Sequence, residues 1–183
     1  MSDFKLFQNW IYTQYIEFEY PNQCALKDLS EAFSKEYQFT SLWIYGPSQD
    51  IRDVNPPVLN INIYPKNADN PYYQNVGEGL ERKIQLIHTS ASELQEWNED
   101  LANSFIRENK ILSDREIEVD ETKARELVMA HYDYQEGKQF VERNVAFKKG
   151  SCVYEFSFQV PDEGDDKYIH VYERFLSTFR VSF

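Results

Sequence analysis

The strongest constraint on the fold is a regular alternation of side chains between Cys152 and Val160. Every second position is apolar, and three of the intervening positions are polar. The apolar set is Cys152, Tyr154, Phe156, Phe158 and Val160, and the polar set is Glu155, Ser157 and Gln159. Because successive side chains of a strand point to opposite faces, the pattern predicts a strand with one face in a core.

The segments before this strand predict an antiparallel meander. Residues 115–120 alternate in polarity, and residues 139–147 are rich in residues that favour strands. Residues 126–134 are almost continuously apolar, which is typical of a strand covered on both faces. Short turns containing Gly137 and Gly150 join the last three strands and require antiparallel pairing.

Strands are also predicted in the first third of the chain. Residues 16–20 alternate and stop at Pro21, and two β-rich segments follow at 40–45 and 58–64. The prolines of residues 46–57 indicate a loop between the last two.

Three helices are predicted. Residues 26–37 have apolar side chains at helical spacing, and Ser90–Glu93 fits a capping box that begins a second helix. That helix has an apolar stripe about 16 residues long and is expected to lie on a flat surface. The stripe is Leu94, Trp97, Leu101, Phe105 and Ile106. A third helix after Asp165 presents an aromatic face, formed by Tyr168, Val171, Tyr172, Phe175, Leu176 and Phe179. Residues 83–88 fit either a strand or the approach to a helix.

These elements predict an α+β protein with a central, mainly antiparallel sheet of about six or seven strands and helices on both faces. The 183 residues suit a single domain over 1–183, since no repeat or composition shift marks a second one.

Charge excludes some partners. The chain has a net charge of −12, which disfavours nucleic acid and anionic lipid headgroups. Its apolar runs are too short to span a bilayer. Charged and amide side chains fill the first 20 residues, so the chain as given is expected in the cytoplasm. An extracytoplasmic or lipoprotein location is expected if a signal was removed before residue 1. The sequence does not indicate an oligomeric state.

No catalytic, cofactor or metal motif is recognisable, and we expect no cofactor and no catalytic residue. Six glycines include no phosphate-binding loop, and the sequence has neither a nucleophile elbow nor a zinc-hydrolase motif. His131 is expected in the interior and His170 in solvent. Cys152 is expected to be buried, and a bridge between Cys24 and Cys152 stays open as an alternative. An acidic strip of Glu116, Glu118 and Asp120 fits either a solvated strand face or a cation-attracting surface.

The long loop at 65–79 is the predicted contact surface. Long loops in compact domains are often functional, and this one contains Tyr72, Tyr73 and Asn75, a composition typical of interfaces. These three residues are the candidates for binding a protein partner. The alternative is that the two tyrosines fold back to cover a sheet edge.

Several ordered motifs resemble one family. They are Phe18–Pro21, Lys110–Ser113, Ala124–Val128, Phe140–Val145, Gly150–Phe158, Asp165–Tyr168 and Ser177–Arg180. The chain is similar in these segments to the PsbP family, named for an extrinsic subunit of photosystem II, and to its bacterial relatives. The similarity covers roughly residues 90–183 well and the first 65 loosely. It implies an α-β-α sandwich and, in most relatives, a non-enzymatic binding or assembly role. Many relatives are exported, often as lipoproteins, but this sequence has no lipidation cysteine near its start.

The leading hypothesis is therefore a non-catalytic, PsbP-like domain, of bacterial type, that binds a protein partner. One alternative is a cytosolic chaperone of secretion effectors with a PsbP-like domain, which shields apolar client segments. A second is an enzyme whose site is not recognisable from sequence.

Overall fold

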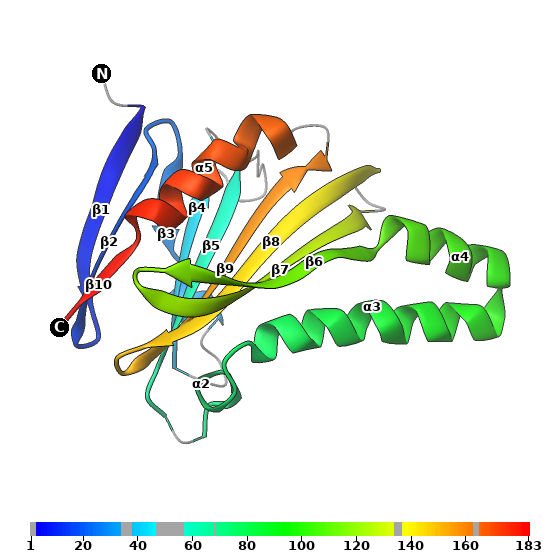
Figure 1. Ribbon diagram of the computed structural model, residues 1–183, viewed down its shortest axis with the longest axis horizontal. Helices are drawn as coiled ribbons and strands as arrows, with labels where there is room; N and C mark the ends of the chain where they lie inside the picture. The colour runs from blue at the N-terminus through cyan, green and yellow to red at the C-terminus, as the bar shows by residue number, and fades with distance from the viewer. Residues whose placement is uncertain (1–2, 34–37, 47–56, 68, 134–136, 163–164) are drawn as a thin grey trace.

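Two antiparallel sheets and five helices form the fold of the computed structural model, which describes residues 3–33, 38–46, 57–67, 69–133, 137–162 and 165–183 (Figure 1). The small sheet has the order β1-β2-β10, with β1 at Phe4–Ile11, β2 at Gln14–Pro21 and β10 at Arg180–Ser182. The large sheet has the order β3-β4-β5-β9-β8-β7-β6. Its strands are β3 (Ala25–Asp28), β4 (Thr40–Tyr45), β5 (Val58–Pro65), β6 (Lys110–Val119), β7 (Thr122–Asp133), β8 (Lys138–Lys149) and β9 (Cys152–Pro161). The helices are α1 (Ser30–Phe33), α2 (Pro71–Gln74), α3 (Glu78–Trp97), α4 (Glu99–Glu108) and α5 (Asp165–Thr178).

The alternating strand is the middle strand of the large sheet. β9 pairs with β5 on one side and with β8 on the other, so that Phe156 lies opposite Ile61 and Val145. All five apolar residues of its predicted core face are buried in one cluster. The predicted α+β class, the seven-stranded antiparallel sheet and the meander are confirmed.

An aromatic core lies between one face of the large sheet and a layer made of α5 and the small sheet. Phe156 makes edge-to-face contacts with Phe175 and Phe179, at ring-centroid distances of 4.9 and 4.8 Å. Phe18 of β2 stacks on Phe179 at 6.1 Å. The aromatic face predicted for the last helix is therefore confirmed. The predicted strand at 16–20 is confirmed as well, although it lies in the small sheet.

A second, smaller apolar cluster lies on the opposite face of the large sheet. Leu80 of α3 packs there with Leu127 and Met129 of β7 and Ala146 of β8. Val128, between the two β7 residues, joins the aromatic core. β7 is thus covered on both faces, as its continuous apolar run predicts, and helices lie on both faces of the sheet.

Two helix predictions are wrong in their bounds. Leu26 lies in strand β3 and pairs with Ile44, because the preceding turn places residues 25–28 at the open edge of β4. Of the helix predicted over 26–37, the structure contains only α1 (Ser30–Phe33). Residues 34–37 lie outside the described part. Ser90–Glu93 do not begin a helix but lie inside α3, where the Ser92 hydroxyl donates to the His88 carbonyl at 3.0 Å. The ambiguous residues 83–88 are helical. No helix in the described ranges is long and apolar enough to cross a membrane.

Candidate functional site

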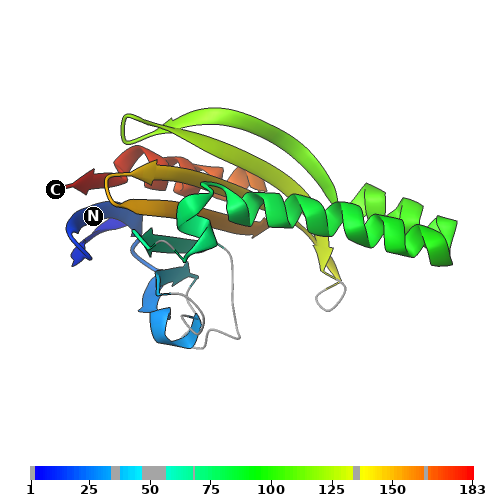
Figure 2. The same cartoon turned by 90° about the horizontal axis from the view of Figure 1, so that it is seen from below.

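A pair of helices projects from the body of the protein. α3 and α4, which together we call the helical arm (Glu78–Glu108), contact each other and extend past the ends of the strands, toward the right of Figure 1. The same projection is visible in the turned view of Figure 2. α3 has 20 residues, which corresponds to a length of about 30 Å. Leu80 is the only buried residue of α3, and Ala102 is the only one of α4. Within the described residues, α3 packs on the large sheet through its first turns, and the far part of the arm has no buried residue except Ala102.

The apolar side chains of the arm tip (Glu93–Leu101) are exposed. Trp97 is 89% exposed and Leu101 is 56% exposed. The expected continuous stripe is wrong because Asn98 divides the segment. The Asn98 side chain accepts hydrogen bonds from the backbone N–H groups of Asp100 and Leu101, at 2.9 and 3.2 Å, and so begins a new helix. The chain turns back at this point, and Trp97 is left in solvent.

The arm tip is also strongly acidic. Residues 84–106 contain four acids, Glu93, Glu96, Glu99 and Asp100, and no lysine or arginine. All four carboxylates are in exposed residues, and none is in an ion pair within the described residues. The tip thus combines an exposed indole ring with a local negative potential.

The predicted contact residues lie elsewhere, beside the central strands. Tyr72 stacks on Tyr64 of β5 with a centroid distance of 4.8 Å and an interplanar angle of 8°, and the Arg82 guanidinium lies 5.0 Å from its ring. The Tyr73 ring lies under the Lys148 ammonium at 4.2 Å. Both tyrosines are half-buried, which agrees with the alternative that they fold back to cover a sheet edge. Asn75 is exposed. A role of the three in partner binding stays a prediction.

A polar cavity lies where the arm meets the sheet. It has a volume of about 280 Å³ between the first turns of α3 and the face of β5, β9 and β8 opposite the aromatic core. Its lining residues are mostly polar: Trp43, Asn60, Asn62, Gly79, Leu80, Lys83, Glu142, Asn144, Glu155, Phe156, Ser157 and Gln159. We call it the sheet cavity. The sequence shows one part of it, the polar face of β9, but not the helix that covers that face.

Two buried carboxyl groups of the sheet cavity have opposite pKa shifts. Burial alone would raise the pKa of Glu142, but the Lys83 ammonium and the Ser157 hydroxyl, which donates at 2.6 Å, outweigh it and lower this pKa. Burial raises the pKa of Glu155, and the Gly79 N–H, donating at 3.1 Å, offsets it only in part. Lys83 and Ser157 therefore stabilise the carboxylate form of Glu142, whereas burial acts against the carboxylate form of Glu155.

The Gly79 backbone lies close to the carboxyl group of Glu155. A Cβ atom there would lie 2.5 Å from a carboxyl oxygen of Glu155. The same oxygen, Oε2, accepts a hydrogen bond from the Tyr64 hydroxyl at 3.4 Å, whereas the Gly79 N–H donates to Oε1. Glu155 thereby connects the start of the arm to the central strand.

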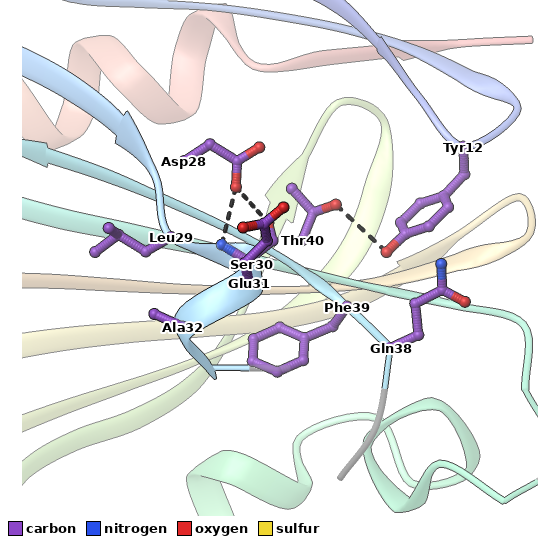
Figure 3. Close-up of a pocket in the computed structure, with 9 residues that line it drawn as sticks. All are labelled: Tyr12, Asp28, Leu29, Ser30, Glu31, Ala32, Gln38, Phe39 and Thr40. Carbon is purple, nitrogen blue, oxygen red and sulfur yellow. Dashed lines mark hydrogen bonds between the residues drawn. The ribbon is translucent and has the colours of Figure 1, made fainter. Parts of the chain in front are cut away.

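A surface hollow of about 1150 Å³ lies beside α1 (Figure 3). Its polar groups bond to one another: Thr40 donates to the Tyr12 hydroxyl at 3.3 Å, and the backbone N–H of Ser30 donates to Asp28 at 2.9 Å. Residues that precede and follow the undescribed segment 34–37 line this hollow. The hollow is therefore not a candidate site.

The histidines and cysteines are dispersed. His131 is half-buried and stacks on Phe140 at 5.7 Å, and His170 is exposed as predicted. Cys24 and Cys152 are both buried free thiols, and burial raises the pKa of Cys24 to about 11. No group of three or more histidine, cysteine, aspartate or glutamate side chains in the described part of the chain is arranged to hold a metal ion.

The predicted acidic strip is largely occupied by cationic side chains. Glu116 pairs with Lys123 at 2.9 Å, and Asp120 pairs with Lys149. The Asp120 carboxylate also accepts the backbone N–H of Val181 at 2.8 Å. These contacts hold the strand ends together and leave little free charge for a cation.

Comparison with solved structures identifies the fold. Cyanobacterial PsbP (CyanoP) from Synechocystis has a TM-score of 0.55 and 11% identity, and the match covers 97% of this chain and 92% of that one. LpqN, involved in cell envelope biogenesis of Mycobacterium tuberculosis, has a TM-score of 0.50 and 9% identity over 100% and 93%. A protein of Bacteroides thetaiotaomicron has a TM-score of 0.49 and 13% identity over 92% of this chain; the match spans only 45% of that longer protein.

The chain therefore has a PsbP-like fold, which it shares with CyanoP and LpqN at low sequence identity. The resemblance predicted from its motifs is confirmed as a similarity of fold. No protein-family model and no curated protein sequence matches the chain.

Proposed function

We propose that this protein is a non-catalytic, protein-binding domain whose partner docks on the arm tip. The observation that carries the proposal is the position of Trp97, 89% exposed at the end of a projecting pair of helices. Tryptophan is enriched among the residues that dominate protein interfaces, and an exposed indole ring gains apolar burial when a partner covers it. A helical arm presents such an anchor away from the body of the protein.

The charge around Trp97 defines the chemistry of the partner. Four acidic residues flank Trp97 in the sequence, with no lysine or arginine between positions 84 and 106. A complementary partner surface therefore has an apolar pocket for the indole ring, with lysine or arginine residues around it. Charge complementarity of this kind accelerates association and disfavours acidic partners. The partner is thus a basic protein surface. An assembly role of this kind is compatible with the likeness of fold to LpqN, which is involved in cell envelope biogenesis.

Site-specific photo-cross-linking tests the proposal. A photoreactive phenylalanine analogue replaces Trp97 in the full chain, expressed in the organism that carries the gene, and cross-linked proteins are identified by mass spectrometry. Trp10 offers a matched control, because it is a tryptophan with 61% exposure on strand β1, at the opposite end of the molecule from the arm.

The proposal predicts one dominant adduct at position 97 that is absent at position 10. Its yield should fall when the acids at positions 96 and 100 are neutralised by Glu96→Gln and Asp100→Asn. The proposal is wrong if position 97 gives no adduct, if both positions give the same proteins, or if the partner's contact surface is acidic.

A further inference from the structure

We propose that the sheet cavity binds a small uncharged molecule that carries several hydroxyl or amide groups. The cavity lies on the face of the sheet opposite the aromatic core and is separate from the arm tip. The inference is independent of the proposed protein partner, since it concerns a different surface and a different kind of ligand.

The first argument is a pair of buried polar atoms that have no partner among the described residues. Asn144 is 1% exposed, lines the cavity, and its side-chain Nδ2 makes no hydrogen bond; the same holds for the buried Oδ1 of Asn62. Buried amide groups are almost always hydrogen-bonded, because leaving one unpaired loses its hydration without compensation. The cavity thus offers one unused donor and one unused acceptor to a ligand.

The sheet register shows how these atoms are arranged. Asn144 on β8 and Asn60 on β5 both lie opposite Ser157 of β9, which places the three in one row across the sheet. Asn62 lies in the next row, opposite Glu155. The unused donor and acceptor therefore lie on two strands that flank β9, and a ligand that satisfies both must have polar groups on two of its sides.

The second argument is the charge balance of the cavity. The Glu142 carboxylate is paired with the Lys83 ammonium and also accepts the Ser157 hydroxyl. The remaining acid, Glu155, is buried, and its two carboxyl oxygens already accept the Gly79 N–H and the Tyr64 hydroxyl. Among the described lining residues the one cationic group, Lys83, is already paired and both carboxyl groups already accept hydrogen bonds, so an ionic ligand would be desolvated without a free counter-charge. A neutral ligand avoids this penalty.

The third argument is size and apolar lining. The cavity volume of about 280 Å³ is roughly nine times the volume that one molecule occupies in liquid water. This size suits a ligand with one small ring or a short chain. Leu80 and the half-buried Trp43 provide apolar surface for the carbon skeleton. Binding sites combine a few placed polar groups with apolar walls in this way.

Nuclear magnetic resonance titration of the full chain tests the inference. The neutral probes are D-glucose, myo-inositol and acetamide, and the charged probes are acetate, phosphate and tetramethylammonium. The readout is the side-chain amide resonance of Asn144, which moves when a ligand accepts its hydrogen bond. The expected result is saturable movement with at least one neutral probe and none with the charged ones.

Two variants make the test specific. Binding to the variants is followed on the backbone amide resonance of Gly79, which also lines the cavity, and Asn144→Leu should weaken binding of the neutral probe by at least about tenfold, the effect of losing one buried hydrogen bond. It should still fold, because it removes an unpaired buried group. Asn103→Leu, on the exposed surface of α4, is the control and should bind as the wild type does. The inference is overturned if no neutral probe moves the Asn144 resonance, if a charged probe binds better, or if both variants bind equally.

Discussion

Replacing the most exposed tryptophan should hardly change the stability of this protein. Trp97 is 89% exposed, so about a tenth of its surface is covered by the rest of the chain. A fully buried tryptophan covers up to about 250 Å². A tenth of that area, at about 25 cal/mol per Å², corresponds to about 0.6 kcal/mol. Trp97→Ser should therefore lower the free energy of unfolding by less than about 1 kcal/mol.

Leu80→Ala provides the contrast within the same helix. Leu80 is 2% exposed and is the buried residue of α3 in its contact with β7 and β8, where the partly buried Ile84 and Ile87 also pack. Truncating a buried leucine to alanine removes about 2–5 kcal/mol, because a cavity adds to the lost burial. The order of the two effects is opposite to the one expected from side-chain size.

Urea unfolding followed by far-UV circular dichroism measures both variants. The linear dependence of the unfolding free energy on urea gives the two differences under the same conditions. If Trp97→Ser lost 2 kcal/mol or more, the indole ring would be packed in the protein. The arm tip would then not be a free surface, and the reasoning about partner binding would fail.

Other predictions concern the body of the protein. Phe156→Ala should lower the free energy of unfolding by about 3–5 kcal/mol, measured by urea unfolding, and a change below 1 kcal/mol would place Phe156 outside the core. The pKa of Glu155 is raised in the folded state, so its stabilising contribution is present below its usual value of 4.5 and is lost as pH rises through the folded-state pKa. Wild type should therefore lose stability relative to Glu155→Gln as pH rises above about 4.5, and parallel pH profiles would contradict the shift. Tyr72→Ala should lower stability by about 1–2 kcal/mol through the lost stack on Tyr64, in contrast to a freely exposed contact loop; an unchanged melting temperature would refute the stack.

Sequence patterns predicted the body of the fold because its signals are local. The alternation around Phe156 lies within one strand, and the aromatic spacing around Phe175 lies within one helix. Each pattern predicts a single apolar face, and the two faces are buried against each other in one core. The antiparallel pairing of β9 with β8 follows from the short turn that joins them. Such signals depend little on distant parts of the chain.

The arm was not predictable in the same way. The apolar spacing from Leu94 to Phe105 fits one straight helix, and a single residue, Asn98, changes the result by beginning a second helix. Asparagine is a good N-cap, but it is also tolerated inside helices, so its presence alone does not divide a helix. Whether Trp97 packs or projects is decided by that break.

The sheet cavity depends on contacts between distant residues. Gly79 and Glu155 are 76 positions apart in sequence, and their hydrogen bond places the start of α3 over the polar face of β9. The sequence indicates that Glu155 and Ser157 share a face, but the covering helix is positioned by the packing of Leu80 on Leu127, Met129 and Ala146 of the same face. Buried polar groups of this kind become recognisable only in the folded chain.

The affinity of the cross-linked partner for purified variants tests the central claim, that the arm tip is the binding surface. Isothermal titration would compare wild type, Trp97→Ser and Trp10→Ser at low and high salt. The account predicts that Trp97→Ser weakens binding by about tenfold or more, that Trp10→Ser leaves it unchanged, and that wild-type affinity falls with salt. Equal affinities for the two tryptophan variants, or an affinity independent of salt, would contradict it.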